Sequence, residues 1–591
     1  MSLARVAASA LALVVVSSVL SAPPTQALSV TALPPAEECL YDDNPAVALN
    51  RAERIMARHL QLGTHPDWIL PVNPTWREQP FNGDLNWLFN YHALRWLLAL
   101  LQAGRDTGDP AYAARASFLL NDWLVSNPRS STATKQAWND MATGFRASVM
   151  ACATRDLGRP TWLLLGLKAH GTALADPNFY TWHGNHALNQ VIGLVDVACV
   201  LPNSTWKTLG TSRMAALVTE SVDAEGVTNE QSVGYQYYNW FHYERARRHL
   251  IACHLTVPSA FSRVTKMPEF MAYATAPDGY YVQLGDTDLQ QAIDIPDTLA
   301  EFAATKGLSG PKPPALIRRY AAGFLFARSG WGETRPFDQE TLITMRFGPG
   351  IALHGHMDGQ SLTLTSLGRR LLVDPGKYTY TPGPWKDWFE SRAAHSVVTV
   401  DGLAFDGRAK TAFGSVGKAN VYYASMTNPG YAGVANRRRV VWSRITDYVI
   451  VDDVLSSAAT RTYRQTWHLA RGSAPTISGN RLDTHFSGAN LAVVQLVGKP
   501  SSRILAGRTS PIQGWVSETY NVKLSAPVLQ ATIQSRAARF LTLLVPYSGT
   551  RPAISGRVVS LTSTGYVVDV TIGTHVERVT VNTSGASIVE R

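Results

Sequence analysis

The residues with the clearest chemical potential are histidines and aspartates in the second half of the sequence. His354 and His356 are separated by one residue, and Asp374 and His395 follow at longer intervals. In a strand, residues two apart point to the same face, so the two imidazoles would converge. Together with Asp374 and His395, they offer a nitrogen and oxygen ligand set suited to Zn²⁺. Because the chain has 15 histidines, a chance pair of solvent-facing strand histidines is the competing interpretation.

A second polar group stands in the first half, where Asn185 and His186 begin a predicted helix. Helix capping would explain Asn185 alone. Further along, Tyr235, Tyr238 and His242 recur at i, i+3 and i+7 and therefore share one helical stripe. Aromatic packing between helices is the simpler explanation of that stripe when it is taken by itself.

Helices must position the second group, because the chain from about residue 45 to 310 has helical patterns separated by short polar or Pro/Gly breaks. Serial helix pairs without strand-like alternation favour an α-toroid or solenoid, in which neighbouring hairpins bury each other's faces. The predicted helices cover Leu85–Ala103 and residues near 111–126, 141–155, 160–175, 185–200, 208–222, 229–254 and 258–274.

Strands must position the first group. The proline cluster Gly310–Pro314 is typical of a linker, and beyond it the hydrophobic period becomes two. Many short β-rich runs predict an antiparallel β-sandwich. These runs include Leu342–Phe347, Leu362–Thr365, Val397–Val400, Arg439–Ser443, Tyr448–Asp452, Val558–Leu561 and Tyr566–Thr571.

Composition limits the class of protein. With 591 residues, 45% hydrophobic and 17% charged, the chain is neither disordered nor a polytopic membrane protein. Its net charge of +10 favours a polyanionic partner, which charge alone leaves open among nucleic acid, a membrane surface and an acidic polymer. Four cysteines are too few for a disulfide scaffold; one or two disulfides and buried free thiols are both compatible with the sequence.

The N-terminus narrows this choice. Arg5 is followed by the apolar run Ala10–Leu20 and by small residues suited to cleavage, so we expect residues 1–27 to be a secretory signal peptide. An exported basic protein rarely meets nucleic acid. No later apolar run has the roughly 18–20 residues of a membrane span, and we expect the mature chain to be secreted, extracellular or periplasmic.

The order of motifs along the chain resembles the heparinase II/III-like polysaccharide lyases, and the resemblance spans nearly the whole mature chain. Its most specific part is His354-x-His356-x-Asp358 with Asp374-Pro-Gly376 and Ala394-His395. The other matching segments are Asn86–His92, Thr107–Asp109, Tyr112, Gly184–His186, Glu230-x-Ser232-x-x-Tyr235, Gly323-Phe324, Arg328–Trp331, Gly368 and Val400–Gly402. The resemblance implies an α+β multidomain chain, with an incomplete α/α toroid over residues 28–315 and an antiparallel β-sandwich over residues 316–591.

The resemblance also implies roles for individual residues. Tyr235 matches the catalytic tyrosine, Asn185 the residue that neutralises the substrate carboxylate, and His354 a catalytic or carboxylate-facing histidine. His186 follows Asn185 as in alginate-lyase-like members, and Arg146 falls near the usual place of an active-site arginine. The ligands of a structural zinc are matched by His356, Asp374 and His395.

Two places need separate treatment. The family's tyrosine motif usually continues with histidine, whereas here Gln236 follows Tyr235, which puts a helper role for that neighbour in doubt. The segment between Asp374 and His395 is aromatic and basic, and some lyases of this fold recruit a second tyrosine there. Sugar stacking and a purely structural role are the alternatives. The candidate substrate-binding residues of this segment are Tyr378, Tyr380, Trp388 and Arg392.

The predicted function is β-elimination on a uronic-acid polysaccharide of heparan or heparosan type, with alginate or glucuronan as alternative substrates. A glycoside hydrolase on an α/α toroid would need two carboxylates beside the scissile bond. Candidates for such a pair are Asp223, Glu225 and Glu230, or Asp286 and Asp288. A non-catalytic polysaccharide-binding protein is the third alternative. The uronate epimer, sulfation, endo or exo action and oligomeric state do not follow from the sequence.

Overall fold

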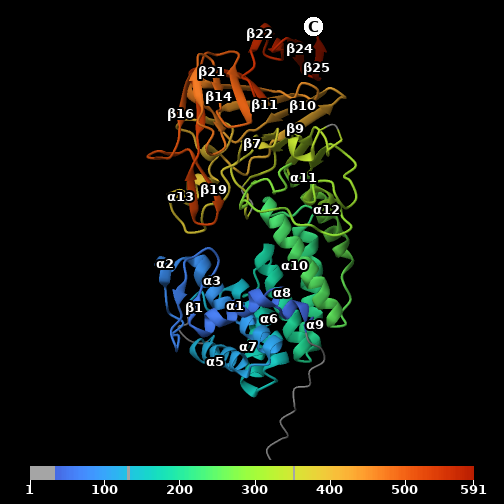
Figure 1. Cartoon of the computed structure of the whole chain (residues 1–591), viewed down its shortest axis with the longest axis vertical. Helices are drawn as coiled ribbons and strands as arrows, with labels where there is room; N and C mark the ends of the chain where they lie inside the picture. The colour runs from blue at the N-terminus through green and yellow to red at the C-terminus, as the bar shows by residue number, and fades with distance from the viewer. Residues whose placement is uncertain (1–33, 130–133, 334, 351–352) are drawn as a thin grey trace, which may run out of the picture.

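The computed structural model describes residues 34–129, 134–333, 335–350 and 353–591. The predicted signal peptide, residues 1–27, lies outside them. The described chain has a helical part followed by a β part, stacked along the long axis of the molecule, with α10–α12 running between the two (Figure 1). None of the helices in the described ranges is both long and apolar enough to cross a membrane.

Successive helices of the first half pack against one another around a shared core. The helix α8 is its most deeply placed element, because every residue of α8 except His186 is buried. The elements of this half are the helices α1 (Pro45–Met56), α2 (Pro80–Gly83), α3 (Leu85–Ala93), α4 (Leu97–Thr107), α5 (Pro110–Ser126), α6 (Asp140–Asp156), α7 (Thr161–Ala175), α8 (Gly184–Val200), α9 (Ser204–Ser221), α10 (Val233–Ala252), α11 (Met267–Ala274) and α12 (Leu299–Ala304), the 3-10 segments η1 (Glu37–Cys39) and η2 (Ser259–Lys266), and the short strands β1 (His59–Leu60) and β2 (Trp68–Ile69).

Two predicted helices are each divided in the structure. The stretch Leu85–Ala103 was expected to be one helix, but α3 ends at Ala93 and Leu94 takes a left-handed conformation with φ 58° before α4 begins. Residues 258–274 form η2 and then α11, with Pro268 in the first turn of α11. Proline lacks the N–H that an interior helical position needs, so a helix boundary beside it is the physically expected outcome.

The described β half is built around three large antiparallel sheets stacked on one another, with two further two-stranded sheets, β17–β18 and β19–β20. Alternate residues of the large central sheet face opposite layers: Val440 and Trp442 pack toward the sheet β3–β7, whereas Val441 packs toward β22–β25. The strand order is β3-β4-β5-β6-β7 in one outer sheet, β13-β14-β15-β21-β12-β11-β10-β9 in the central sheet, where β16 also pairs with β21 and β8 with β12, and β22-β23-β24-β25 in the other outer sheet.

The β half begins at Ile317, after α12 has ended at Ala304. Its elements are β3 (Ile317–Tyr320), β4 (Phe324–Arg328), η3 (Phe337–Gln339), β5 (Leu342–Arg346), β6 (Leu362–Ser366), β7 (Arg369–Leu372), α13 (Pro384–Glu390), η4 (Arg392–Ala394), β8 (Val398–Val400), β9 (Ala412–Gly417), β10 (Val421–Thr427), β11 (Val434–Ser443), β12 (Val449–His468), β13 (Thr476–Ser478), β14 (Arg481–Asp483), β15 (Ala489–Gln495), β16 (Ser501–Leu505), β17 (Arg508–Thr509), β18 (Ile512–Gln513), β19 (Trp515–Thr519), β20 (Val522–Ser525), β21 (Val528–Ser548), β22 (Ile554–Leu561), β23 (Tyr566–Ile572), β24 (His575–Asn582) and β25 (Gly585–Glu590).

The four cysteines form two disulfides, Cys39–Cys152 and Cys199–Cys253. The second joins the C-terminal ends of α8 and α10 and spans 54 residues of sequence. Closing a loop of that length in the unfolded chain is worth about 4 kcal/mol in the chain-entropy model. We therefore expect the paired change Cys199→Ala and Cys253→Ala to lower the free energy of unfolding by about that amount. Denaturant titration measures it, and an unchanged midpoint would contradict it.

Candidate active site

Tyr235 lies in the first turn of α10 and meets side chains from the β half. Its ring stacks on the imidazole of His354, with ring centroids 3.5 Å apart and an interplanar angle of 5°. Its hydroxyl lies 2.8 Å from the hydroxyl of Tyr380. The start of α10 is held by Thr287, whose hydroxyl accepts a hydrogen bond from the Gly234 N–H at 2.9 Å. Two tyrosines and a histidine distant in sequence thus share one site.

Asn185 joins this site from the first turn of α8. The N-cap residue of α8, His183, makes no side-chain capping hydrogen bond. The fully buried Glu230 instead accepts the Asn185 backbone N–H through Oε1 at 2.9 Å, and it accepts Nδ2 through Oε2 at 3.0 Å. Asn185 Nδ2 also lies 3.5 Å from His354 Nε2. Glu230, which belongs to the family motif and was also considered as a hydrolase carboxylate, therefore orients the Asn185 amide beside His354.

The surroundings of Tyr235 favour its neutral form. Burial raises the pKa of Tyr235 well above its ordinary value, the nearby carboxylates of Asp286 and Glu230 raise it further, and the hydrogen bond with Tyr380 opposes them. A tyrosine that acts as a base would benefit from nearby cations that lower its pKa, but the charged groups that act on Tyr235 among the described residues are carboxylates. In the free protein the phenol is a proton donor, and Tyr380 is the contact that stabilises its phenolate.

His354 and His356 are not in a strand, which corrects the geometric basis on which they were paired. They lie in the loop between β5 and β6. Their link is the carboxylate of Asp286: His354 Nδ1 donates to Oδ2 at 2.8 Å, and His356 Nε2 donates to Oδ1 at 3.1 Å. Although burial opposes its ionisation, these hydrogen bonds hold the pKa of Asp286 below its ordinary value.

His356, Asp374 and His395 converge as predicted, each buried and offering a ligand atom within 4.8 Å of the others. His395 Nδ1 donates to the Ser391 carbonyl at 2.8 Å, so Nε2 carries a lone pair. His356 donates through Nε2, and its Nδ1 lone pair faces His395 Nε2 at 3.3 Å. The Asp374 carboxylate lies 3.6 Å from the same Nε2. The two imidazole lone pairs and the carboxylate thus face one another with no hydrogen-bond donor between them. A cation would satisfy all three acceptors, so this group can hold a metal ion.

Arg146 and His186 are placed differently from each other. Arg146 is fully buried between helices, where Nη1 donates to the His92 carbonyl at 2.6 Å and the guanidinium lies 3.7 Å from the Trp123 ring centre. Arg146 holds α6 against α3 and does not contact Tyr235. His186 stays partly exposed beside Asn185 and pairs with Asp140 at 3.0 Å. Burial lowers the pKa of His186, but the hydrogen bond that His186 donates to the Asp140 carboxylate, together with the charge of Asp140, outweighs burial and raises it.

In the aromatic segment, only part of the predicted substrate-binding set faces open space. Arg392 is buried and donates to the Gly359 carbonyl at 2.6 Å, and Trp388 is buried against Phe389. Both stabilise the β half and do not reach Tyr235. Tyr380 contacts Tyr235, whereas Tyr378 lines a separate interdomain pocket of about 340 Å³. The other residues of that pocket are Phe81, Asn82, Gly83, Asp84, Thr379, Thr381, Pro382, Gly383, Pro384, Trp385, Lys386 and Asn521.

The residues considered for a hydrolase have other partners. Asp223 accepts the N–H groups of Glu225 and Val227, and Asp288 pairs with Lys377 at 3.1 Å. Asp286 has both oxygens bound to histidines. Gln236 is buried and accepts the Thr228 N–H, so it braces a turn and does not assist Tyr235. Glu225 accepts the Ala321 N–H, and Glu230 accepts the Asn185 amide groups. All five candidate carboxylates are therefore engaged in hydrogen bonds or ion pairs of the folded protein.

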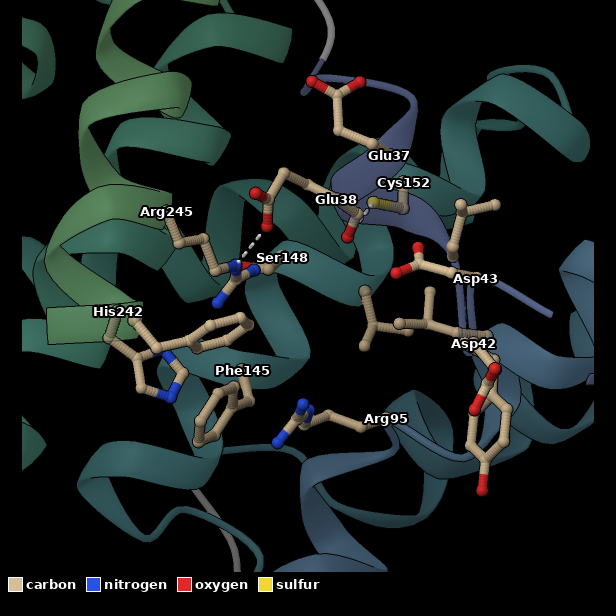
Figure 2. A pocket seen from close by; sticks show the side chains of 15 residues that line it. Glu37, Glu38, Asp42, Asp43, Arg95, Phe145, Ser148, Cys152, His242 and Arg245 are labelled. Atoms are coloured by element: carbon tan, nitrogen blue, oxygen red, sulfur yellow. Dashed lines mark hydrogen bonds and ion pairs between the residues drawn. The ribbon is translucent and has the colours of Figure 1, made fainter. Parts of the chain in front are cut away.

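A further cavity of about 340 Å³ lies within the helical half, farther along α10 than Tyr235. Figure 2 shows Arg95 pointing into it, with His242 and Arg245 on the opposite wall and the N-terminal residues Glu38 and Asp43 along its edge. Glu38 accepts a hydrogen bond from Arg245 Nε at 2.9 Å. Its walls carry charges of both signs, and none of the residues paired around Tyr235 lines it.

Two family models match most of the chain: the Heparinase II/III N-terminus matches residues 64–305, and the Heparinase II/III-like C-terminal model matches residues 318–555. The chain is 23% identical to a heparin-sulfate lyase of Pedobacter heparinus over 533 residues, covering 81% of this chain and 78% of that protein. It is 20% identical to a heparin-sulfate lyase of Bacteroides stercoris over 556 residues, covering 83% and 80%.

Solved structures share the fold. A heparinase III crystal structure has a TM-score of 0.78 at 16% identity, covering 95% of this chain and 93% of that one. A mutant heparan sulfate lyase from Pedobacter heparinus has a TM-score of 0.69 at 21% identity, covering 92% and 91%. Together with the two family models, these matches confirm the predicted fold class. The chain belongs to the heparinase II/III-like family of polysaccharide lyases.

Proposed function

We propose that the protein cleaves a uronic-acid-containing anionic polysaccharide of heparan or heparosan type by β-elimination. The observation that carries this proposal is the meeting of Asn185, Tyr235, His354 and Tyr380 in one site. Two relatives named heparin-sulfate lyase support the substrate class. The net charge of +10 would attract an anionic chain.

Elimination removes the C5 proton of the uronate, and the oxygen linked at C4 leaves. The negative carboxylate at C5 opposes formation of the carbanion, so a hydrogen-bond donor must offset that charge. The Asn185 amide, fixed by Glu230, is the donor that we assign to this role. We assign His186, one residue further along α8, as a second hydrogen-bond donor for the same carboxylate, and its raised pKa favours the protonated imidazole.

The uronate epimer decides which group moves the proton. When the C5 proton and the leaving oxygen are on one face, Tyr235 must first release its own phenolic proton to solvent. The phenolate, stabilised by Tyr380, then takes the C5 proton and gives it to the leaving oxygen. When they are on opposite faces, His354 takes the proton. His354 Nδ1 carries the ring proton and donates a hydrogen bond to Asp286, so the lone pair that accepts the C5 proton is on Nε2. The neutral Tyr235 then donates its phenolic proton to the leaving oxygen.

We propose Zn²⁺ as the ion held by His356, Asp374 and His395, because two imidazole nitrogens and a carboxylate oxygen form a ligand set that zinc prefers. Bound zinc would supply positive charge that fixes these three buried side chains. The proton steps are assigned to Tyr235 and His354.

The interdomain pocket near Tyr378 is our candidate subsite for a more distant sugar of the same chain. Phe81 and Asn82 line it in left-handed conformations at φ 56°, a strained arrangement of the kind found at ligand sites. Trp385 offers an aromatic face, and the ammonium of Lys523 lies 4.6 Å from its ring centre. An anionic sugar would therefore find both stacking and positive charge there.

Trp385→Ala tests this subsite. Loss of about 1 kcal/mol of stacking would raise KM for long chains about fivefold, with kcat unchanged and little effect on the shortest cleavable oligosaccharide. Phe118→Ala removes an exposed aromatic side chain from α5, remote from the pocket, and should leave both constants unchanged. Equal KM values for Trp385→Ala and the wild type on long chains would refute the subsite.

The last part of the proposal concerns the location of the enzyme. We propose that residues 1–27 direct secretion and that the enzyme acts outside the cytoplasm. The two disulfides support this assignment, because disulfides persist mainly in oxidising compartments.

A panel of heparan-type, heparosan, hyaluronan, alginate and glucuronan chains tests the function. Growth of ultraviolet absorbance from an unsaturated uronate on a heparan-type or heparosan chain supports it. Absorbance only with alginate or glucuronan would show the same β-elimination reaction on a different substrate and would replace the heparan or heparosan assignment. New reducing ends without absorbance would indicate hydrolysis, and binding without either signal would indicate a non-catalytic role.

A further inference from the structure

Asp286 lies between the metal-ligand group and His354, and its carboxylate forms a hydrogen bond with each. Its Oδ1 accepts from His356 and its Oδ2 from His354. The carboxylate is almost fully buried, with 5% of the residue exposed. It therefore has no direct route to the solvent or to a substrate, and its chemistry is confined to the two imidazoles.

The backbone around Asp286 fixes this carboxylate in place. The Asp286 N–H donates to the His354 carbonyl at 2.9 Å, and the Asp286 carbonyl accepts the Ser232 hydroxyl at 2.9 Å. Gly285 has φ +63°, and a Cβ there would lie 2.7 Å from the carbonyl oxygens of both Gln231 and His354. Because only glycine fits, the loop is held tightly between His354 and the segment that leads into α10.

A carboxylate can only accept hydrogen bonds, which sets the tautomers of both rings. His354 must carry its proton on Nδ1, so the Nε2 lone pair faces Asn185. His356 must carry its proton on Nε2, so the Nδ1 lone pair faces His395. One carboxylate thus prepares one histidine for a metal and the other for the substrate.

We propose that Asp286 is a positioning residue that couples the metal centre to His354. Through it, the ion that holds His356 also fixes the tautomer of His354 and the stacking of its ring on Tyr235. A hydrogen-bonded carboxylate behind a metal-bound histidine is a common way to orient the ligand; here the same carboxylate also orients a histidine of the active site. The proposal rests on the proposed function for His354.

Asp286→Asn is the primary test, made on the metal-loaded enzyme. The amide keeps the size of the side chain but has one acceptor oxygen, so it can serve only one of the two N–H donors. We expect kcat to fall about 10–100-fold, the range found when partners of a metal ligand are changed. KM should stay unchanged because Asp286 does not reach substrate. With Co²⁺ in place of zinc, the visible absorption band should shift and release of Co²⁺ to a chelator should become faster.

Asp288→Asn is the matched control, since it removes a carboxylate two residues away that pairs with Lys377 and contacts neither histidine. It should keep the kcat and the cobalt spectrum of the wild type. His354→Gln is the reciprocal variant: it lies outside the ligand group, yet it should also shift the cobalt band through Asp286. This second variant keeps the test decisive if Asp286→Asn does not fold.

A double-mutant cycle with Asp374→Asn, which removes a metal ligand but leaves the Asp286–His354 bond, measures the coupling. The double variant should lose less kcat than the product of the two single losses. Effects that simply multiply, a rise in KM in place of the fall in kcat, or a cobalt band unchanged in both Asp286→Asn and His354→Gln would overturn the proposal. Absence of eliminase activity in the wild type would instead reject the proposed function, and the cobalt measurements would still decide the coupling.

Discussion

Tyr235→Phe is expected to lower kcat/KM about 10²–10⁴-fold, the usual contribution of a positioned acid or base. The change removes one hydroxyl, the atom that lies 2.8 Å from Tyr380 and would exchange the proton with substrate. The ring and its stacking on His354 remain, so the melting temperature should change little. Initial rates of ultraviolet absorbance, together with thermal unfolding of the same preparations, give both results.

Tyr237→Phe is the control for this change. Tyr237 is two residues along α10 and contacts Trp240 and Tyr281, away from His354. Removing its hydroxyl should leave the rate of elimination unchanged. If Tyr235→Phe retained wild-type activity, or if both variants lost activity equally, Tyr235 would not be the proton-transfer group.

Removal of the metal ion is expected to lower the free energy of unfolding by more than the loss of one contact on the protein surface would. His356, Asp374 and His395 are buried, and burial in the absence of a cation raises the pKa of Asp374 to about 8. Without the ion, the facing acceptors must take up protons or separate. Leaving a buried charge without its partner costs about 3–5 kcal/mol, so chelation should lower the melting temperature by several degrees.

The measurement pairs elemental analysis with thermal unfolding before chelation, after it and after Zn²⁺ is restored. Restoration should recover the original melting temperature. Among molecules that remain folded, kcat should fall no further than it does in Asp286→Asn, because the ion acts on His354 only through Asp286, and Tyr235 and Asn185 do not contact the ligand group. A protein that contains no metal as purified, or unaltered melting after verified removal, would reject the zinc assignment.

The periodicities of the sequence predict the fold because each half has one dominant period. The change from helical to strand-like spacing after Gly310–Pro314 predicts a helical half followed by sheets, and the family matches confirm it. The break at Leu94 escaped prediction because the run Leu85–Ala103 is largely apolar and contains no glycine or proline to mark a helix end. Its left-handed residue is set by tertiary packing, as Leu94 is fully buried in the helical core.

The candidate site was only partly accessible to sequence reasoning. Its motif residues Asn185, Tyr235 and His354 are brought together, but the carboxylates that orient them were missed. Glu230 and Asp286 act through contacts across 45 and 68 residues of sequence, which no local period encodes. A weaker signal was available: Glu230 is part of the family motif, although its role there was not inferred, and a buried acid such as Asp286 needs a partner.

Two arginines illustrate the opposite error. Arg146 and Arg392 are charged residues near expected motif positions, where a sequence suggests contact with an anionic substrate. In the structure both guanidinium groups are buried, donate to backbone carbonyls and lie over aromatic rings. Arginine can be buried in this way because its planar group stacks on aromatic rings while its N–H groups donate hydrogen bonds.

The masses of the products from a defined heparan-type oligosaccharide test the central claim most directly. β-Elimination at the Tyr235 site predicts two fragments whose masses add up to that of the substrate, one of them carrying an unsaturated uronate at its non-reducing end. The same sample treated with Tyr235→Phe should remain intact. Fragments that together exceed the substrate by the mass of one water would show hydrolysis and contradict the assignment.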